Sequence, residues 1–127
     1  MVIKRTFTGA PWEKAVGYCR AVRSGSFIAI SGTTSVNPDG SVHGAGEAYQ
    51  QALRCFELIE KALNELHTNR KSIVRTRMFV TDISNWKEFG RAHAEFFADN
   101  PPATSMIEVK ALINSQLLIE VEADAVD

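Results

Sequence analysis

The sequence contains few of the residues that mark disulfide-rich or metal-binding proteins. It has two cysteines in 127 residues, Cys19 and Cys55, and their separation does not match the close ligand pairs of a structural zinc site. In a reducing compartment, two small thiols are more often free than joined. We therefore expect free cysteines, no metal site and no cofactor.

Charge of one sign and long apolar runs are also scarce. The formal net charge is -1, so the whole chain offers no bulk attraction to nucleic acid or to an anionic membrane. No apolar run approaches the roughly 20 residues of a membrane helix, and the first residues lack the apolar core of a secretory signal. We expect a cytoplasmic protein without a membrane or nucleic-acid partner.

The length and composition are those of one soluble globular domain over residues 1–127. Hydrophobic residues make up 45% of the chain and charged residues 23%, which excludes a disordered protein. A chain of this length can bury one core but is short for two domains.

The first third of the chain alternates short apolar segments with turn residues. Arg23-Ser24-Gly25-Ser26 joins two such segments, which predicts a β-hairpin. The predicted elements are an edge strand over 2–7, a loop over 8–14, hairpin strands over 17–22 and 27–31, and an irregular segment over 33–46.

Two later segments have apolar residues at helical spacing. The first predicted helix covers 47–66, and the second starts at a capping Ser84 or Asn85 and ends before Pro101. Their apolar stripes consist of Ala48, Ala52, Cys55, Phe56, Ile59, Ala62, Leu63 and Leu66, and of Trp86, Phe89, His93, Phe96 and Phe97.

Three further segments alternate with the period of two that a half-buried strand requires. They cover 73–81, 104–111 and 117–125. In the first, Val74, Thr76, Met78 and Val80 oppose Arg75, Arg77 and Phe79. The order β-β-β-α-β-α-β-β predicts an α+β fold, in which one face of a single sheet carries both helices. The other face must then be solvated or meet another chain.

The end of the chain resembles the C-terminal signature of the reactive intermediate deaminase family, RidA, also called the YjgF family. The resemblance rests on Pro102-Ala103, Ser105 and Glu108-Val109 ahead of Ile119-Glu120-Val121-Glu122-Ala123. Matching segments upstream are Tyr18-Cys19-Arg20-Ala21-Val22-Arg23 with Gly25, Ile30-Ser31-Gly32, Phe79-Val80-Thr81-Asp82 and Glu95-Phe96-Phe97. It implies a chorismate-mutase-like fold with a mixed sheet, a homotrimer, and small-molecule clefts between subunits.

The resemblance also assigns roles to individual residues. Glu120 falls where the family associates a carboxylate with the catalytic water, the general-base role that imine hydrolysis needs. Tyr18 falls at the active-site tyrosine, and Ser31 and Gly32 fall where backbone groups line the cleft. The residues alone also fit plainer roles, which are a solvated carboxylate face for Glu120 and Glu122 and core or interface packing for Tyr18.

Three positions depart from the family pattern. Thr104 replaces an arginine that binds the carboxylate of 2-imino acids, Met106 replaces a cysteine, and Gly90 falls at an asparagine of the second helix. A neutral hydroxyl contributes only about 1 kcal/mol through a hydrogen bond, so Thr104 cannot replace a bidentate guanidinium. Arg75 and Arg77 are the cations whose strand positions match the cleft face. They line either the ligand site, for which Arg77 is the first candidate, or a trimer interface with Glu120, Glu122 or Glu108.

Three functions remain open from the sequence. The first is an enzyme that hydrolyses an imine or enamine lacking the usual carboxylate. The second is a non-catalytic ligand-binding or chaperone-like trimer. RNA cleavage or translation inhibition, an activity attributed to some relatives, ranks last because the aromatic residues follow core spacing and not that of a base-stacking platform.

Overall fold

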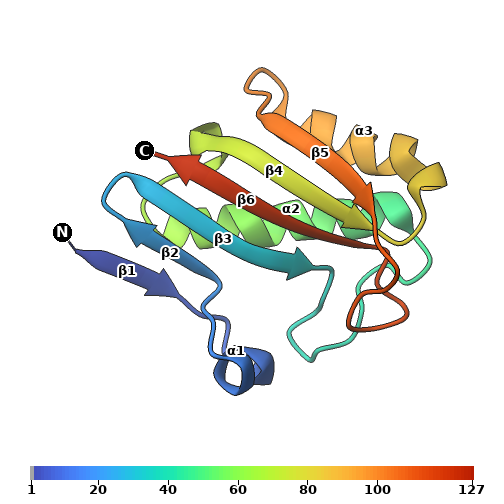
Figure 1. Ribbon diagram of the computed structural model, residues 1–127, viewed down its shortest axis with the longest axis horizontal. Coiled ribbons are helices and arrows are strands. Elements are labelled where there is room, and N and C mark those ends of the chain that lie inside the picture. The colour runs from blue at the N-terminus through green and yellow to red at the C-terminus, as the bar shows by residue number, and fades with distance from the viewer. Residues whose placement is uncertain (1) are drawn as a thin grey trace.

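The computed structural model describes residues 2–127 and has one mixed six-stranded sheet with strand order β1-β2-β3-β6-β4-β5 (Figure 1). Only the edge pair β4 and β5 is parallel, because α3 crosses between them. The α+β architecture is the predicted one. The elements are β1 (Ile3–Thr6), α1 (Pro11–Val16), β2 (Ala21–Ser24), β3 (Phe27–Thr34), α2 (Ala48–Glu65), β4 (Ile73–Val80), α3 (Trp86–Phe97), β5 (Ala103–Glu108) and β6 (Ile119–Val126), with 3-10 turns η1 (Arg70–Ser72) and η2 (Ile83–Asn85).

Helices α2 and α3 cover one face of the sheet, as predicted (Figure 1). Phe56 of α2 stacks on Phe96 of α3 at 5.1 Å between ring centroids, which joins the two helices over the core. Trp86 was wrongly assigned to the apolar stripe. It is 54% exposed at the first residue of α3.

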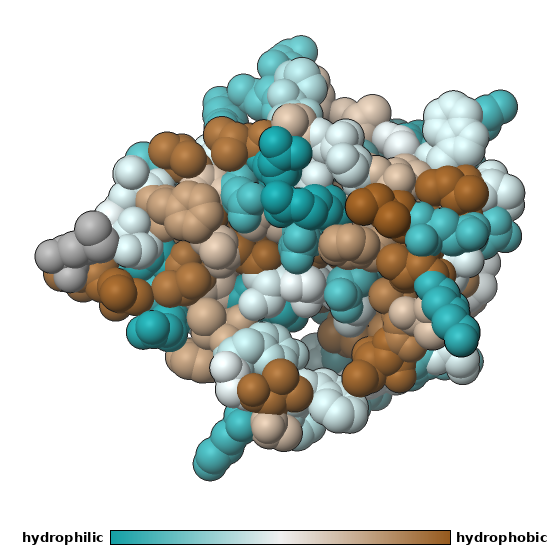
Figure 2. All heavy atoms as spheres, viewed as in Figure 1, coloured by the Kyte–Doolittle hydropathy of each residue, from teal (hydrophilic) through white to brown (hydrophobic). Residues whose placement is uncertain are grey.

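The opposite face of the sheet is uncovered in the single chain. Arg77, Glu122 and Asp124 form a charged centre there, and Figure 2 shows hydrophobic residues scattered around hydrophilic ones on this side. Phe27 and Val126, which pair across β3 and β6, are 48% and 51% exposed. This face therefore carries both charged and large apolar side chains that no other part of the described chain covers.

The predicted loop over 8–14 is wrong, since α1 begins at Pro11. Proline suits the first helical turn, where it has no donor to leave unpaired. The carboxylate of Glu13 accepts hydrogen bonds from the backbone N–H groups of Thr8 and Gly9 at 3.0 and 3.2 Å. Glu13 is therefore buried in a stretch that looks like a loop in the sequence.

Three other local predictions are corrected. The second strand begins at Ala21 and not at residue 17, because α1 and its following turn take up the earlier residues. Val74 is 49% exposed and not on the core face, since the pairing of β4 with β6 shifts register between Ile73 and Arg75. Asn85 stands at the start of α3 but its side chain caps nothing.

Candidate functional site

A group of four residues, three of them predicted site residues, lies near the adjacent strands β2, β3 and β6. Glu120 extends over Gly32, so closely that a Cβ atom at Gly32 would lie 2.7 Å from its Oε2. The Arg20 guanidinium donates to the carbonyl oxygen of Gly32 at 2.6 Å and lies 5.7 Å from the centre of the Tyr18 ring. The structure thus brings Tyr18, Gly32 and Glu120 together, and it adds Arg20.

Ser31 lies in the same region and donates hydrogen bonds to backbone carbonyl oxygens. Its hydroxyl donates to the carbonyl oxygen of Cys19 at 2.7 Å, and its N–H donates to the carbonyl oxygen of Arg20 at 3.0 Å. These bonds fix the segment that carries Tyr18 and Arg20 against β3. Ser31 therefore shapes this wall by holding its chain segments together.

The Glu120 carboxyl has a perturbed pKa. It is half-buried, and burial raises the pKa of its carboxyl above the ordinary value. The nearby Arg20 partly offsets that rise, and Glu122 adds to it. Within residues 2–127 the Glu120 carboxylate makes no hydrogen bond, so its oxygens are free to accept from a water or a ligand.

Thr104 belongs to a second group at the β5 edge of the sheet. The hydroxyl of Thr76 donates to that of Thr104 at 2.7 Å and lies 2.8 Å from Nε2 of His93 on α3. Burial lowers the pKa of His93 to about 4, so its ring is neutral near pH 7. Met106 is partly buried on the same side and packs against the core.

The two groups lie on opposite faces of the sheet. Thr104 pairs with Thr76, which pairs with Ala123 on the helix-covered face, whereas Glu120 alternates with the buried residues of β6 and points the other way. The spacing and rise of strands place the Cα atoms of Thr104 and Glu120 about 14 Å apart in one chain. One small ligand cannot contact both residues within a single chain.

The expectation that Arg75 and Arg77 are the only cations available to the cleft face is corrected by Arg20. The Arg77 guanidinium lies 3.3 Å from the carboxylate of Glu122, one of the partners predicted for it, and 3.2 Å from that of Asp124, which was not predicted. Arg20 was overlooked because the sequence predicted one strand over 17–22. Nothing in the sequence showed which of these six residues would contact the site. Its position two residues after Tyr18, on the same side of an extended segment, was the available signal.

Gln51 is a buried polar residue that the helical pattern did not reveal. Its side-chain amide donates to the carbonyl oxygens of Gly44 and Gln116 at 3.2 and 2.9 Å, and its Oε1 accepts from the N–H of Leu118 at 2.8 Å. Leu118 directly precedes β6. Gln51 therefore holds the segment from which Glu120 extends.

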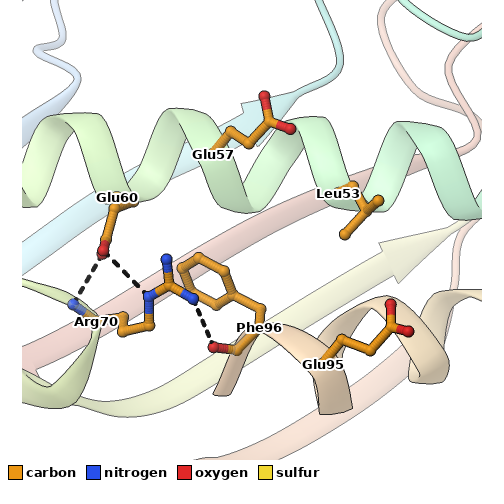
Figure 3. A pocket seen from close by; sticks show the side chains of 6 residues that line it. All are labelled: Leu53, Glu57, Glu60, Arg70, Glu95 and Phe96. Carbon is orange, nitrogen blue, oxygen red and sulfur yellow. Dashed lines mark hydrogen bonds and ion pairs between the residues drawn. The ribbon is translucent and has the colours of Figure 1, made fainter. Parts of the chain in front are cut away.

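A hollow of about 370 Å³ lies on the outer side of the molecule between α2 and α3 (Figure 3). Glu60 accepts there from the backbone N–H and Nε of Arg70 at 2.9 and 3.1 Å, and Arg70 donates to the carbonyl oxygen of Phe96 at 2.9 Å. These contacts tie η1 to both helices. The predicted site residues are not part of this hollow.

Three further features bear on the class of protein. Over residues 2–127, His, Cys, Asp and Glu form no group of three or more that could hold a metal ion. In the same part of the chain, every helix is too short or too polar to cross a membrane. Cys19 and Cys55 are free thiols, as expected.

Comparison with known proteins identifies the family. The model of the family described as endoribonuclease L-PSP matches residues 8–127. The chain is 32% identical to the "Uncharacterized protein SCO2049" of Streptomyces coelicolor over 97% of this chain and 91% of that protein. It is 27% identical to the RutC family protein PYRAB12510 of Pyrococcus abyssi, over 88% of each.

Solved structures agree with this assignment. The crystal structure of Rv2704 from Mycobacterium tuberculosis, a member of the YjgF/YER057c/UK114 family, matches with a TM-score of 0.91 and 40% identity over 99% of this chain and 100% of that one. The YjgF gene product of Escherichia coli matches with a TM-score of 0.82 and 29% identity over 97% of each. The chain therefore belongs to the RidA/YjgF family, the family of the endoribonuclease L-PSP model.

Proposed function

We propose that the protein is a cytoplasmic homotrimer that hydrolyses an imine or enamine in a cleft between subunits, with Glu120 as the general base. The observation that carries the proposal is the Glu120 carboxylate, which is half-buried, has a raised pKa, and makes no hydrogen bond within residues 2–127. A base is most effective when its pKa lies near the working pH, and burial moves Glu120 in that direction.

The placement of the site residues on two faces of the sheet supports a cleft formed by two chains. Glu120, Gly32 and Tyr18 belong to one face, whereas Thr104 belongs to the opposite face at the β5 edge. In the proposed ring of subunits, we place the β5 edge of one chain beside the uncovered face of the next, a heterologous contact that can close into a ring. The residues around Thr104 in one chain then form one side of a cleft. Glu120, Gly32 and Tyr18 of its neighbour form the other side.

The proposed reaction needs one base and one water. Glu120 takes a proton from the water as its oxygen bonds to the imine carbon, and the C=N electron pair moves to nitrogen. The protonated carboxyl returns that proton to nitrogen, which gives a carbinolamine. Glu120 then takes the hydroxyl proton of the carbinolamine as the C=O bond forms and transfers it to nitrogen, so the C–N bond breaks and ammonia leaves a carbonyl product. Arg20 supports this step because it favours the ionised form of Glu120.

Thr104 provides the test of this proposal. If an arginine at this position binds the carboxylate of 2-imino acids, its loss costs about 2 to 5 kcal/mol in transition-state binding. The wild-type protein should therefore turn over 2-iminobutanoate or 2-aminoacrylate poorly. Thr104→Arg should increase this turnover, and Thr104→Arg combined with Glu120→Gln should abolish the increase. The imine is generated in situ by an amino acid dehydratase and its loss is followed by semicarbazide trapping.

Two outcomes would contradict the proposal. Equal turnover by Thr104→Arg with and without Glu120→Gln would remove Glu120 as the base. A mass of one chain in light scattering, instead of three times 14.0 kDa, would remove the inter-subunit cleft. Robust wild-type turnover would instead indicate another carboxylate anchor; Arg20→Met and Arg77→Ala would then identify the cation.

A further inference from the structure

The Thr104 group contains a chain of hydrogen bonds that starts inside the core. Thr76 is fully buried, and its hydroxyl has two neighbours, Nε2 of His93 at 2.8 Å and the hydroxyl of Thr104 at 2.7 Å. The His93 ring lies 4.5 Å from the Phe97 ring centre and 5.5 Å from that of Phe56. These rings hold His93 in place, so the chain has a fixed geometry.

The direction of the chain depends on the tautomer of His93. A threonine hydroxyl has one hydrogen, so Thr76 donates either to Thr104 or to Nε2 of His93. With the hydrogen of the neutral ring on Nε2, His93 donates to Thr76 and Thr76 donates to Thr104. Thr104 then keeps its own hydrogen, and its side chain is exposed at the β5 edge. In this arrangement Thr104 is a donor toward the outside.

We propose that His93 and Thr76 are positioning residues that present the Thr104 hydroxyl as a donor, so that the ligand group beside Thr104 is an uncharged acceptor. The carbonyl oxygen of an amide, ester or ketone has this chemistry. This inference rests on the proposed function for the location of the ligand. A ligand carboxylate is disfavoured because Thr104, Thr76 and the neutral His93 provide no positive charge to offset its desolvation.

The ligand-free protein tests the direction of the chain without any reaction. Nitrogen NMR of the imidazole rings distinguishes the two neutral tautomers, and His93 is assigned from the spectrum of His93→Gln. The hydrogen is expected on Nε2 of His93. A hydrogen on Nδ1 would reverse the chain, make Thr104 an acceptor and overturn the inference, while the proposed function of Glu120 would stand.

Binding of two matched probes tests the ligand class. We suggest 2-oxobutanamide and 2-oxobutanoate as the probes. Their binding is measured from the changes in the NMR signals of the Thr104 methyl group and the Tyr18 ring. The amide should bind more tightly than the acid. Thr104→Val should weaken amide binding about fivefold, the loss expected for one neutral hydrogen bond, and Thr104→Ser should retain it.

The positioning role predicts a separate pattern at His93. Glutamine keeps an N–H donor near the position of Nε2, so His93→Gln should bind the amide as the wild type does, whereas His93→Phe should resemble Thr104→Val. Thr68→Val, on a distant turn after α2, is the matched control and should change nothing. Equal binding of acid and amide, or full amide binding by Thr104→Val, would overturn the inference. If neither probe affected Tyr18 or Thr104, the proposed cleft itself would be wrong.

Discussion

Replacing Gly32 with alanine is a direct perturbation of Glu120. The new methyl group would lie 2.7 Å from Oε2 and 2.8 Å from Cδ of Glu120, where ordinary contacts begin near 3.4 Å. The carboxylate must therefore move by about 0.7 Å or change rotamer. The backbone of Gly32 is not in the left-handed region, so the strain falls on the Glu120 side chain.

The expected cost in stability is small, because the displaced group is the end of a flexible side chain. An off-rotamer side chain costs about 1 kcal/mol, which corresponds to a fall in Tm of about 4 °C for a domain of this size. The effect on function should be larger, because a displacement of about 1 Å can reduce a rate about a hundredfold.

Carbon NMR of the glutamate carboxyls during a pH titration measures the displacement without a substrate. A carboxylate pushed away from Gly32 toward solvent loses part of its burial, so the pKa of Glu120 should fall toward its ordinary value. Gly90→Ala is the stability control, since a methyl group there meets no atom within 4 Å and alanine favours the helix. An unchanged Glu120 pKa in Gly32→Ala, or a loss of stability above about 3 kcal/mol, would refute this reasoning.

Three further perturbations follow from the same contacts. Gln51→Leu should lower the free energy of unfolding by about 3 kcal/mol in a denaturant titration, because it leaves the N–H of Leu118 and two carbonyl oxygens unpaired; an unchanged midpoint would contradict this. Glu120→Gln should raise Tm at pH 8, where the wild type carries a buried charge, and the difference should disappear as the pH falls below the ordinary glutamate pKa of 4.5; a constant difference at both pH values would exclude a raised pKa. Arg20→Met should raise the pKa of Glu120 further in the NMR titration, and a fall would show that Arg20 does not act on this carboxylate.

The sequence predicted the strands and helices because most segments have one clear periodicity. The alternation of Ile119, Val121 and Ala123 with carboxylates placed Glu120 on the uncovered face, and the structure agrees. Periodicity could not show that Thr104 lies on the opposite face. That relation depends on the strand order and on the register that pairs Thr104 with Thr76.

The missed features depend on contacts that single residues do not reveal. Pro11 and Gly9 resemble loop residues until Glu13 folds back onto the N–H groups of Thr8 and Gly9. Val74 keeps the alternation of its strand in the sequence, but a register shift turns it outward. The Thr76–His93 contact joins residues 17 positions apart on a strand and a helix, so no local pattern indicates it.

A crystal structure of the assembled protein soaked with 2-oxobutanamide tests the proposed cleft most directly. The expected result is three copies around a threefold axis, with the Thr104 hydroxyl of each chain within about 10 Å of the Tyr18 ring of a neighbour, a span that one small ligand fills by hydrogen bonds at both ends. The amide oxygen should accept from Thr104, and a water should lie between Glu120 and the ligand. A structure in which Thr104 lies far from Tyr18 and Glu120 of every other chain would contradict the account.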